Sequence, residues 1–285
     1  MECLENLPSD RRFKMDDGAT IFARVEGKDD GKPIVLVHGW GLNHKMWELQ
    51  LCSLKERGYK TVSIDLRGSG QSIDPKKNYT YDRWANDLNA VMRELNLDDV
   101  TLAGHSMGGA IAMYYAATHP DSRVQKLVLI AAAGPCMVKR PENPEGLPEV
   151  FFDDLIALLG KRSFRGYQAA FGRFYGTTFP VGRRTAHLEC IPKLLDMFLR
   201  TPYEALIGGL KELRDEDDTH AISQINVKTT ICHGKHDLVV HPGLAQKQQE
   251  LINDASLIWF EHSGHYLFLE EDTKLNRELN RLLEI

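Results

Sequence analysis

Short, fully apolar runs alternate along the chain with longer stretches in which apolar residues recur every three or four positions. Residues 33–37 (PIVLV) form one such run, between Gly31 and Gly39. A run that is apolar at every position is typical of a strand buried on both faces of a sheet. Further strands are expected at residues 61–65, 100–103, 124–131, 227–232 and 256–260.

The stretches between these runs predict helices. Residues 81–96 are amphipathic, with Thr80 as the expected N-cap, and Gly58 ends a helix over 45–57. Further helices are expected at residues 108–117, 242–253 and 270–283. Strands that alternate with helices favour an α/β fold, in which helices cover both faces of a mostly parallel sheet. An antiparallel hairpin is expected before it, with strands at residues 11–15 and 20–25 around the turn 16–18.

The alternation stops between about residues 135 and 223. Only helical stretches follow one another there, at residues 149–159, 165–175, 191–199 and 203–213. We therefore predict one α/β core, formed by residues 1–134 and 224–285, with an all-helical lid at 135–223. Seven phenylalanines of this segment suit a lid over an acyl pocket, although most of them are expected simply to pack the lid against the core: Phe151, Phe152, Phe164, Phe171, Phe174, Phe179 and Phe198. The acidic run 215–218 is expected to be a solvated loop.

Charge and composition limit the classes of function that the chain can have. The 285 residues include 35 Lys and Arg and 40 Asp and Glu, for a net charge of −5, which gives no reason to expect nucleic-acid binding. Residues 1–10 do not resemble a secretory signal, and no apolar run has the roughly 20 residues needed to span a membrane. The five cysteines are odd in number and scattered, which favours reduced thiols and a cytoplasmic protein.

The stretch with the clearest chemistry lies between the strand at 100–103 and the helix at 108–117. It contains Gly104-x-Ser106-x-Gly108, a pattern that places a serine on a sharp turn from strand to helix. Glycines at both flanks remove side chains that would collide across so tight a turn. The free N–H groups at the start of the helix favour developing negative charge. Ser106 is therefore the candidate nucleophile.

A serine nucleophile needs a base, and the base needs an acid that orients it. In open parallel sheets such groups follow the carboxyl ends of strands. Asp237 follows the strand at 227–232, and His265 follows the strand at 256–260. The predicted catalytic set is therefore Ser106, Asp237 and His265.

Several alternatives remain open from the residues alone. His262 could replace His265, and an acid of the run 215–218 could replace Asp237. Five histidines also raise the question of a metal site, although a decorated loop is the simpler interpretation: His233, His236, His241, His262 and His265. His38 is expected to brace its loop, and His105 to lie beside the site. Arg67 and Lys235 are interpreted as loop or sheet-edge charges.

Taken together, the motifs resemble those of the α/β-hydrolase superfamily, from about Phe13 to the end of the chain outside the insertion. The resemblance rests on residues 38–41 (HGWG), 65–72 (DLRGSGQS), 104–109 (GHSMGG), and 234–237 (GKHD) with 263–265 (SGH).

This resemblance implies a serine esterase that needs no cofactor and no metal and acts on small-molecule esters. It also implies an oxyanion hole formed by the backbone N–H groups of Trp40 and Met107. A serine at position 106 argues against the haloalkane dehalogenases and epoxide hydrolases of this fold, which use aspartate there.

A finer resemblance concerns the pimeloyl-carrier-protein methyl ester esterases of biotin synthesis. Residues 38–43 (HGWGLN) with Trp47, and Pro135-Cys136, are similar to them, whereas His105 and Met107 are shared with general esterases, lipases and cofactor-free perhydrolases. An acidic carrier protein would need cations, and residues 139–200 hold ten Lys and Arg against seven Asp and Glu. A perhydrolase and a non-catalytic small-molecule receptor remain alternatives.

Overall fold

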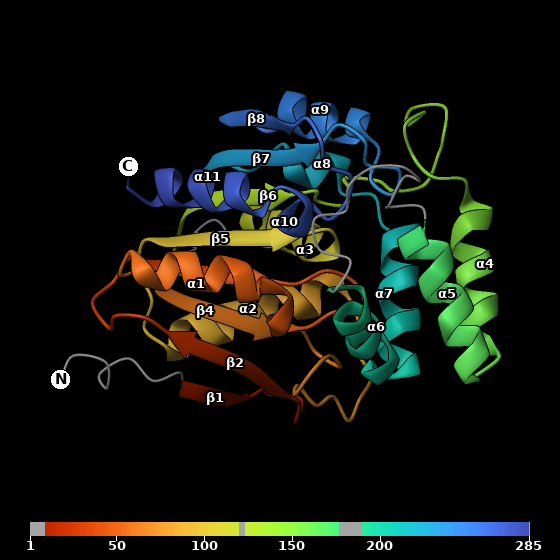
Figure 1. The fold of residues 1–285 in the computed structure, drawn as a ribbon, viewed down its shortest axis with the longest axis horizontal. Helices are drawn as coiled ribbons and strands as arrows, with labels where there is room; N and C mark the ends of the chain where they lie inside the picture. Colours follow the sequence, from red (N-terminus) through yellow and green to blue (C-terminus); the bar gives the residue numbers. More distant parts are fainter. Residues whose placement is uncertain (1–8, 120–122, 177–189, 285) are drawn as a thin grey trace.

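A computed structural model describes residues 9–119, 123–176 and 190–284 of the chain. Its centre is an eight-stranded sheet in the order β1-β2-β4-β3-β5-β6-β7-β8 (Figure 1). The strands are β1 (Ser9–Lys14), β2 (Thr20–Glu26), β3 (Pro33–Val37), β4 (Lys60–Asp65), β5 (Val100–His105), β6 (Val124–Ile130), β7 (Lys228–Gly234) and β8 (Ala255–Phe260). Neighbouring strands are parallel across the part of the sheet that runs β4-β3-β5-β6-β7-β8, while β2 pairs antiparallel with both β1 and β4. The predicted α/β architecture with its leading hairpin is confirmed.

Helices cover both faces of the sheet, as the alternation predicts. On one face α1 packs against α10 and α11; on the other, α2, α3, α8 and α9 form a contiguous layer (Figure 1). The helices are α1 (Glu48–Glu56), α2 (Tyr81–Glu94), α3 (Met107–Thr118), α8 (Thr219–Ile222), α9 (Pro242–Leu251), α10 (Leu267–Glu270) and α11 (Asp272–Glu284). Thr80 caps α2 as expected, since its hydroxyl accepts a hydrogen bond from the N–H of Arg83 at 3.2 Å.

Four further helices lie beyond the carboxyl ends of the central strands (Figure 1). They are α4 (Glu149–Gly160), α5 (Phe164–Gly176), α6 (Ile191–Arg200) and α7 (Tyr203–Asp215). Each lies within two residues of its predicted bounds. The helical insertion therefore stands over the edge of the sheet to which the predicted site residues belong, whereas the division into core and lid at residues 135 and 223 stays a prediction.

Two predicted helices differ in detail. The helix expected over 45–57 begins as a 3-10 turn, His44–Trp47, before α1. The helix expected over 270–283 is two helices, α10 and α11, and Glu271 between them leaves helical geometry. The carboxylate of Glu271 accepts hydrogen bonds from the His262 N–H and the Ser263 hydroxyl, so a contact with the preceding loop coincides with the break.

The acidic run is only partly the solvated loop that was expected. Asp215 ends α7 and is exposed, as are Glu216 and Asp217. Asp218 is half-buried, and burial together with the neighbouring carboxylates raises its pKa to about 6. The sequence alone does not show this because the covering residues come from elsewhere in the chain.

Of the four described cysteines, Cys136 and Cys232 are buried, Cys190 is half-buried and Cys52 is exposed; Cys52, Cys136 and Cys232 are free thiols. Cys3 lies outside the described residues. None of the helices that the structure describes combines the length and the apolar surface required for a bilayer crossing.

Candidate active site

Ser106 occupies the sharp turn that its flanking glycines predict. It follows β5 directly, precedes α3, and has φ 53° and ψ −120°, in the left-handed region that L-residues rarely adopt. A Cβ on Gly104 would overlap the carbonyl of Gly108, and a Cβ on Gly108 would overlap the carbonyl of His38. Glycine is therefore required on both sides of the turn by close backbone approach.

The structure brings the three predicted residues together. His265 Nε2 lies 3.0 Å from Ser106 Oγ, and His265 Nδ1 lies 2.8 Å from Asp237 Oδ2. The side chains of His265 and Asp237 are fully buried, and Ser106 is 4% exposed. These contacts form one continuous chain of hydrogen bonds between residues that lie 159 and 28 positions apart.

The second oxygen of Asp237 is held by backbone. Its Oδ1 accepts hydrogen bonds from the N–H groups of Val239 at 2.8 Å and Val240 at 2.9 Å. Burial by itself would raise the pKa of Asp237, but the imidazoles of His265 and His233 and the hydrogen bond from Val240 outweigh it, so the pKa lies below its ordinary value. Asp237 is therefore a carboxylate with a fixed orientation, suited to hold an imidazole in one tautomer.

The alternatives from the sequence lie elsewhere. His262 is exposed, and its N–H faces Glu271. Asp215 forms an ion pair with Arg214. His233 is buried and donates from Nε2 to the carbonyl of Val240, so it supports the loop of Asp237. In the part of the chain that the structure describes, no three His, Cys, Asp or Glu side chains are grouped so as to hold a metal ion.

The two predicted oxyanion donors belong to two different elements. Trp40 lies in the turn after β3, and Met107 is the first residue of α3. Among the described residues, none accepts a hydrogen bond from the backbone N–H of either. His38 braces the turn as predicted: its Nδ1–H donates to Gly39 O at 2.8 Å, and its Nε2 accepts from the Leu66 N–H at 2.9 Å.

Insertion helices contact this turn directly. The indole N–H of Trp40 donates to the carbonyl of Leu206 in α7 at 2.8 Å. Its ring lies 4.9 Å from that of Phe174 and 5.2 Å from that of Phe198, and Phe174 lies 6.2 Å from the His265 ring. Of the seven phenylalanines, Phe179 lies outside the described residues, Phe164 is exposed, and the other five are buried.

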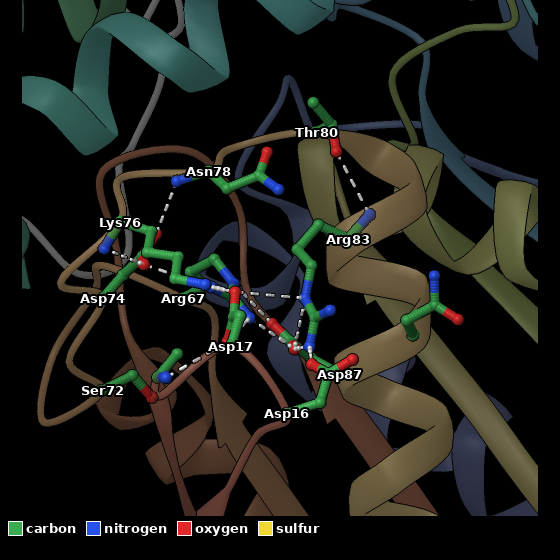
Figure 2. Close-up of polar contacts among 12 residues, drawn as sticks. Asp16, Asp17, Arg67, Ser72, Asp74, Lys76, Asn78, Thr80, Arg83 and Asp87 are labelled. Atoms are coloured by element: carbon green, nitrogen blue, oxygen red, sulfur yellow. Dashed lines mark hydrogen bonds and ion pairs between the residues drawn. The ribbon is translucent and has the colours of Figure 1, made fainter.

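Arg67 lies in the loop after β4, as interpreted, but its charge is buried in a cluster of ion pairs. Its side chain is fully buried, and its five N–H groups contact three carboxylates, two bonds going to Asp87 at 2.8 Å (Figure 2). The other two carboxylates belong to Asp17 and Asp74. Arg83 also forms an ion pair with Asp87. The cluster joins the hairpin turn, the loop after β4, and α2. Sequence reasoning missed it because these acids come from separate segments. Lys235, in contrast, pairs with exposed Glu261 as a surface charge.

Comparison with known proteins identifies the family of the chain. Residues 32–272 match the sequence profile of the family described as alpha/beta hydrolase fold. The chain belongs to the α/β-hydrolase family. This α/β hydrolase is 38% identical to the AB hydrolase superfamily protein YisY of Bacillus subtilis, over 93% of this chain and 95% of that one. It is 33% identical to the bifunctional esterase/perhydrolase DCH of Acinetobacter calcoaceticus, over 92% of this chain and 95% of that one.

Among solved structures, an esterase from Exiguobacterium antarcticum superposes on this α/β hydrolase with a TM-score of 0.90 and 32% identity, covering 97% of this chain and 100% of that one. The finer resemblance also has a counterpart. A pimeloyl-[acyl-carrier protein] methyl ester esterase of Nitrosomonas europaea is 30% identical, over 86% of this chain and 93% of that protein.

Proposed function

We propose that this α/β hydrolase is a serine esterase that cleaves carboxylic esters through an acyl-enzyme. The observation that carries the proposal is the chain of hydrogen bonds from Asp237 through His265 to Ser106 at a strained turn. A serine hydroxyl becomes an effective nucleophile when an oriented base can accept its proton. The names of relatives and structural neighbours, esterases among them, support the same reaction class.

In this mechanism Ser106 Oγ bonds to the ester carbonyl carbon while His265 Nε2 takes the hydroxyl proton. The carbonyl electron pair moves onto its oxygen, where the N–H groups of Trp40 and Met107 hold the oxyanion; each such donor lowers the barrier by about 3 kcal/mol. The carbonyl then re-forms as the bond to the alcohol oxygen breaks, and His265 protonates that alkoxide. Water, deprotonated by His265, hydrolyses the acyl-enzyme, while Asp237 keeps the imidazole in its tautomer.

Residues 135–223 act in this proposal as a lid over the acyl group. The contacts of Phe174 and Phe198 with Trp40 support an apolar environment at the oxyanion turn. Because Trp40 is also hydrogen-bonded to α7, the position of the lid and the position of one oxyanion donor depend on each other. The acyl group is therefore expected to be bound among aromatic side chains rather than charged ones.

The decisive experiment measures hydrolysis of p-nitrophenyl acetate and butyrate by the wild type and by Ser106→Ala. Turnover should fall to background in Ser106→Ala and stay unchanged in a matched control, Ser256→Ala, on β8. A fluorophosphonate should label Ser106, as located by mass spectrometry. Equal turnover in Ser106→Ala would contradict the assignment of the nucleophile. A wild type that binds small molecules but hydrolyses none would favour a receptor.

The relative named as a bifunctional esterase/perhydrolase favours a second candidate, peroxide-dependent acyl transfer. Here hydrogen peroxide replaces water as the nucleophile that attacks the acyl-enzyme, and the products are a peroxy acid and free Ser106. Measuring peroxy acid formed from acetate and hydrogen peroxide separates the two reactions.

The pimeloyl-carrier-protein ester is the narrower substrate proposal. The relative of that name and the excess of cations in residues 139–200 support it. A chain-length series of methyl esters that includes pimeloyl methyl ester tests it. A preference for short acyl chains would remove it.

A further inference from the structure

His105, the last residue of β5, is buried beside the proposed nucleophile and packs against the proposed catalytic histidine. It precedes Ser106 in the chain and is 1% exposed. Its ring lies 4.9 Å from the rings of both His265 and Phe268, and 5.8 Å from that of Tyr266. A side chain packed against the proposed base from the strand that bears the proposed nucleophile is placed to influence how the two meet.

One polar contact defines its orientation. His105 Nε2 lies 3.0 Å from the backbone carbonyl oxygen of His265. A carbonyl can only accept, so Nε2 carries the proton and donates it. The other nitrogen, Nδ1, is buried without a hydrogen-bond partner, and a Cβ on Gly39 would lie 2.7 Å from it. The ring is thus confined to one rotamer and, while neutral, to one tautomer.

The protonation state agrees with this geometry. Burial, and then the neighbouring imidazole of His265, keep the pKa of His105 well below its ordinary value. The groups whose charges act on it also include Asp237 and His38. A neutral ring with a buried Nδ1 is not placed to exchange protons with the substrate, so its contribution is geometric.

Two hydrogen bonds therefore join the end of β5 and the residue that follows it to the same residue of the histidine loop. Ser106 Oγ meets the His265 ring, and His105 Nε2–H meets the His265 carbonyl. The preceding residues of that loop are held from the other side, because the Gly264 N–H donates to Glu270 at 2.8 Å. Without the His105 contact, the backbone of His265 loses its direct hydrogen bond to the strand of the nucleophile.

We propose that His105 is a positioning residue that fixes the distance between Ser106 and His265 by donating from Nε2 to the His265 carbonyl. This inference rests on the proposed esterase function for its effect on rate, but its structural content does not depend on turnover. Misplacement of a reacting group by about 1 Å can cost about 100-fold in rate. The loss should appear in kcat rather than in KM, because His105 does not touch the acyl or alcohol groups.

Two variants separate positioning from packing. His105→Gln keeps an N–H donor at a similar reach, and His105→Phe keeps a ring of similar size without a donor. We expect His105→Gln to retain kcat within about threefold and His105→Phe to lose about 100-fold, with KM little changed in either. Packing alone would give the opposite order, and a His105→Phe variant as active as the wild type would overturn the proposal.

Nuclear magnetic resonance tests the same contact without substrate. In the wild type, spectra of the ¹⁵N-labelled imidazole should show His105 as the neutral Nε2–H tautomer from pH 5.5 to 9. An Nδ1–H tautomer, or a titration of His105 in that range, would overturn the proposal. This test does not require that any variant folds. The low-field Nδ1 proton that His265 shares with Asp237 should persist in His105→Gln and broaden in His105→Phe. Absence of fluorophosphonate labelling in the wild type would instead count against the esterase function.

Discussion

Replacing Arg67 by methionine removes the cation at the centre of the cluster in Figure 2 while keeping most of the side-chain volume. All five N–H groups of Arg67 contact carboxylates, at 2.7 to 3.3 Å. The side chains of Asp17, Asp74 and Asp87 are 13%, 0% and 5% exposed. Methionine would leave these three negative charges buried, with Arg83 as the remaining cation at the cluster.

Breaking a buried ion pair from one side costs about 3–5 kcal/mol, which is a large part of the 5–15 kcal/mol that typically stabilises a protein. Urea unfolding at pH 7.5 should therefore show a loss of about 3–5 kcal/mol in Arg67→Met. Arg67→Lys, which keeps the charge but offers three donors in place of five, should lose less. The matched control is Arg57→Met, whose pair with Glu284 is more than half exposed and should be worth below about 1 kcal/mol.

The loss should also depend on pH. Arg67 lowers the pKa values of Asp17 and Asp87, so without it both pKa values rise in the folded state and the folded chain takes up protons more readily than the unfolded one. Stability is then regained as the pH falls, and the deficit of Arg67→Met should be smaller at pH 5.5 than at pH 7.5. A deficit under about 1 kcal/mol, or one equal at both pH values, would refute the account of Arg67 as the cation that neutralises these acids.

Three further outcomes are expected. Asp237→Asn should lower kcat for p-nitrophenyl acetate by about 10⁴-fold with the fold intact by circular dichroism, because the amide favours the wrong imidazole tautomer; a loss below tenfold would contradict its role. Burial and neighbouring carboxylates raise the pKa of Glu212 to about 7. The folded protein is therefore expected to lose stability as the pH rises through that value. Glu212→Gln should therefore stabilise against urea by about 1 kcal/mol at pH 8 and not at pH 5. In Gly209→Ala, the new Cβ would lie 2.8 Å from the Trp40 ring and 2.9 Å from Met107 Sδ. Overpacking there should lower the free energy of unfolding by about 1–3 kcal/mol and reduce kcat by shifting the oxyanion turn. An unchanged kcat and an unchanged free energy of unfolding would show that the lid helices move instead.

The sequence by itself determined the architecture and the candidate catalytic set. Fully apolar runs define buried strands whatever surrounds them, and their alternation with helical stretches permits few topologies. Ser106, Asp237 and His265 could be found because each follows the carboxyl end of a strand, and a parallel sheet brings those ends to one edge. The insertion was visible because the alternation stopped.

Only the tertiary structure decided which charges are buried and which contacts hold the site. Arg67 meets acids that lie 50, 7 and 20 residues away, and no local pattern brings these together. The break between α10 and α11 coincides with hydrogen bonds from the preceding loop to Glu271, and the contact of His105 is to a backbone carbonyl 160 residues distant. The reason is physical: burial and hydrogen-bond partners are properties of space between elements, whereas periodicity describes only the element itself.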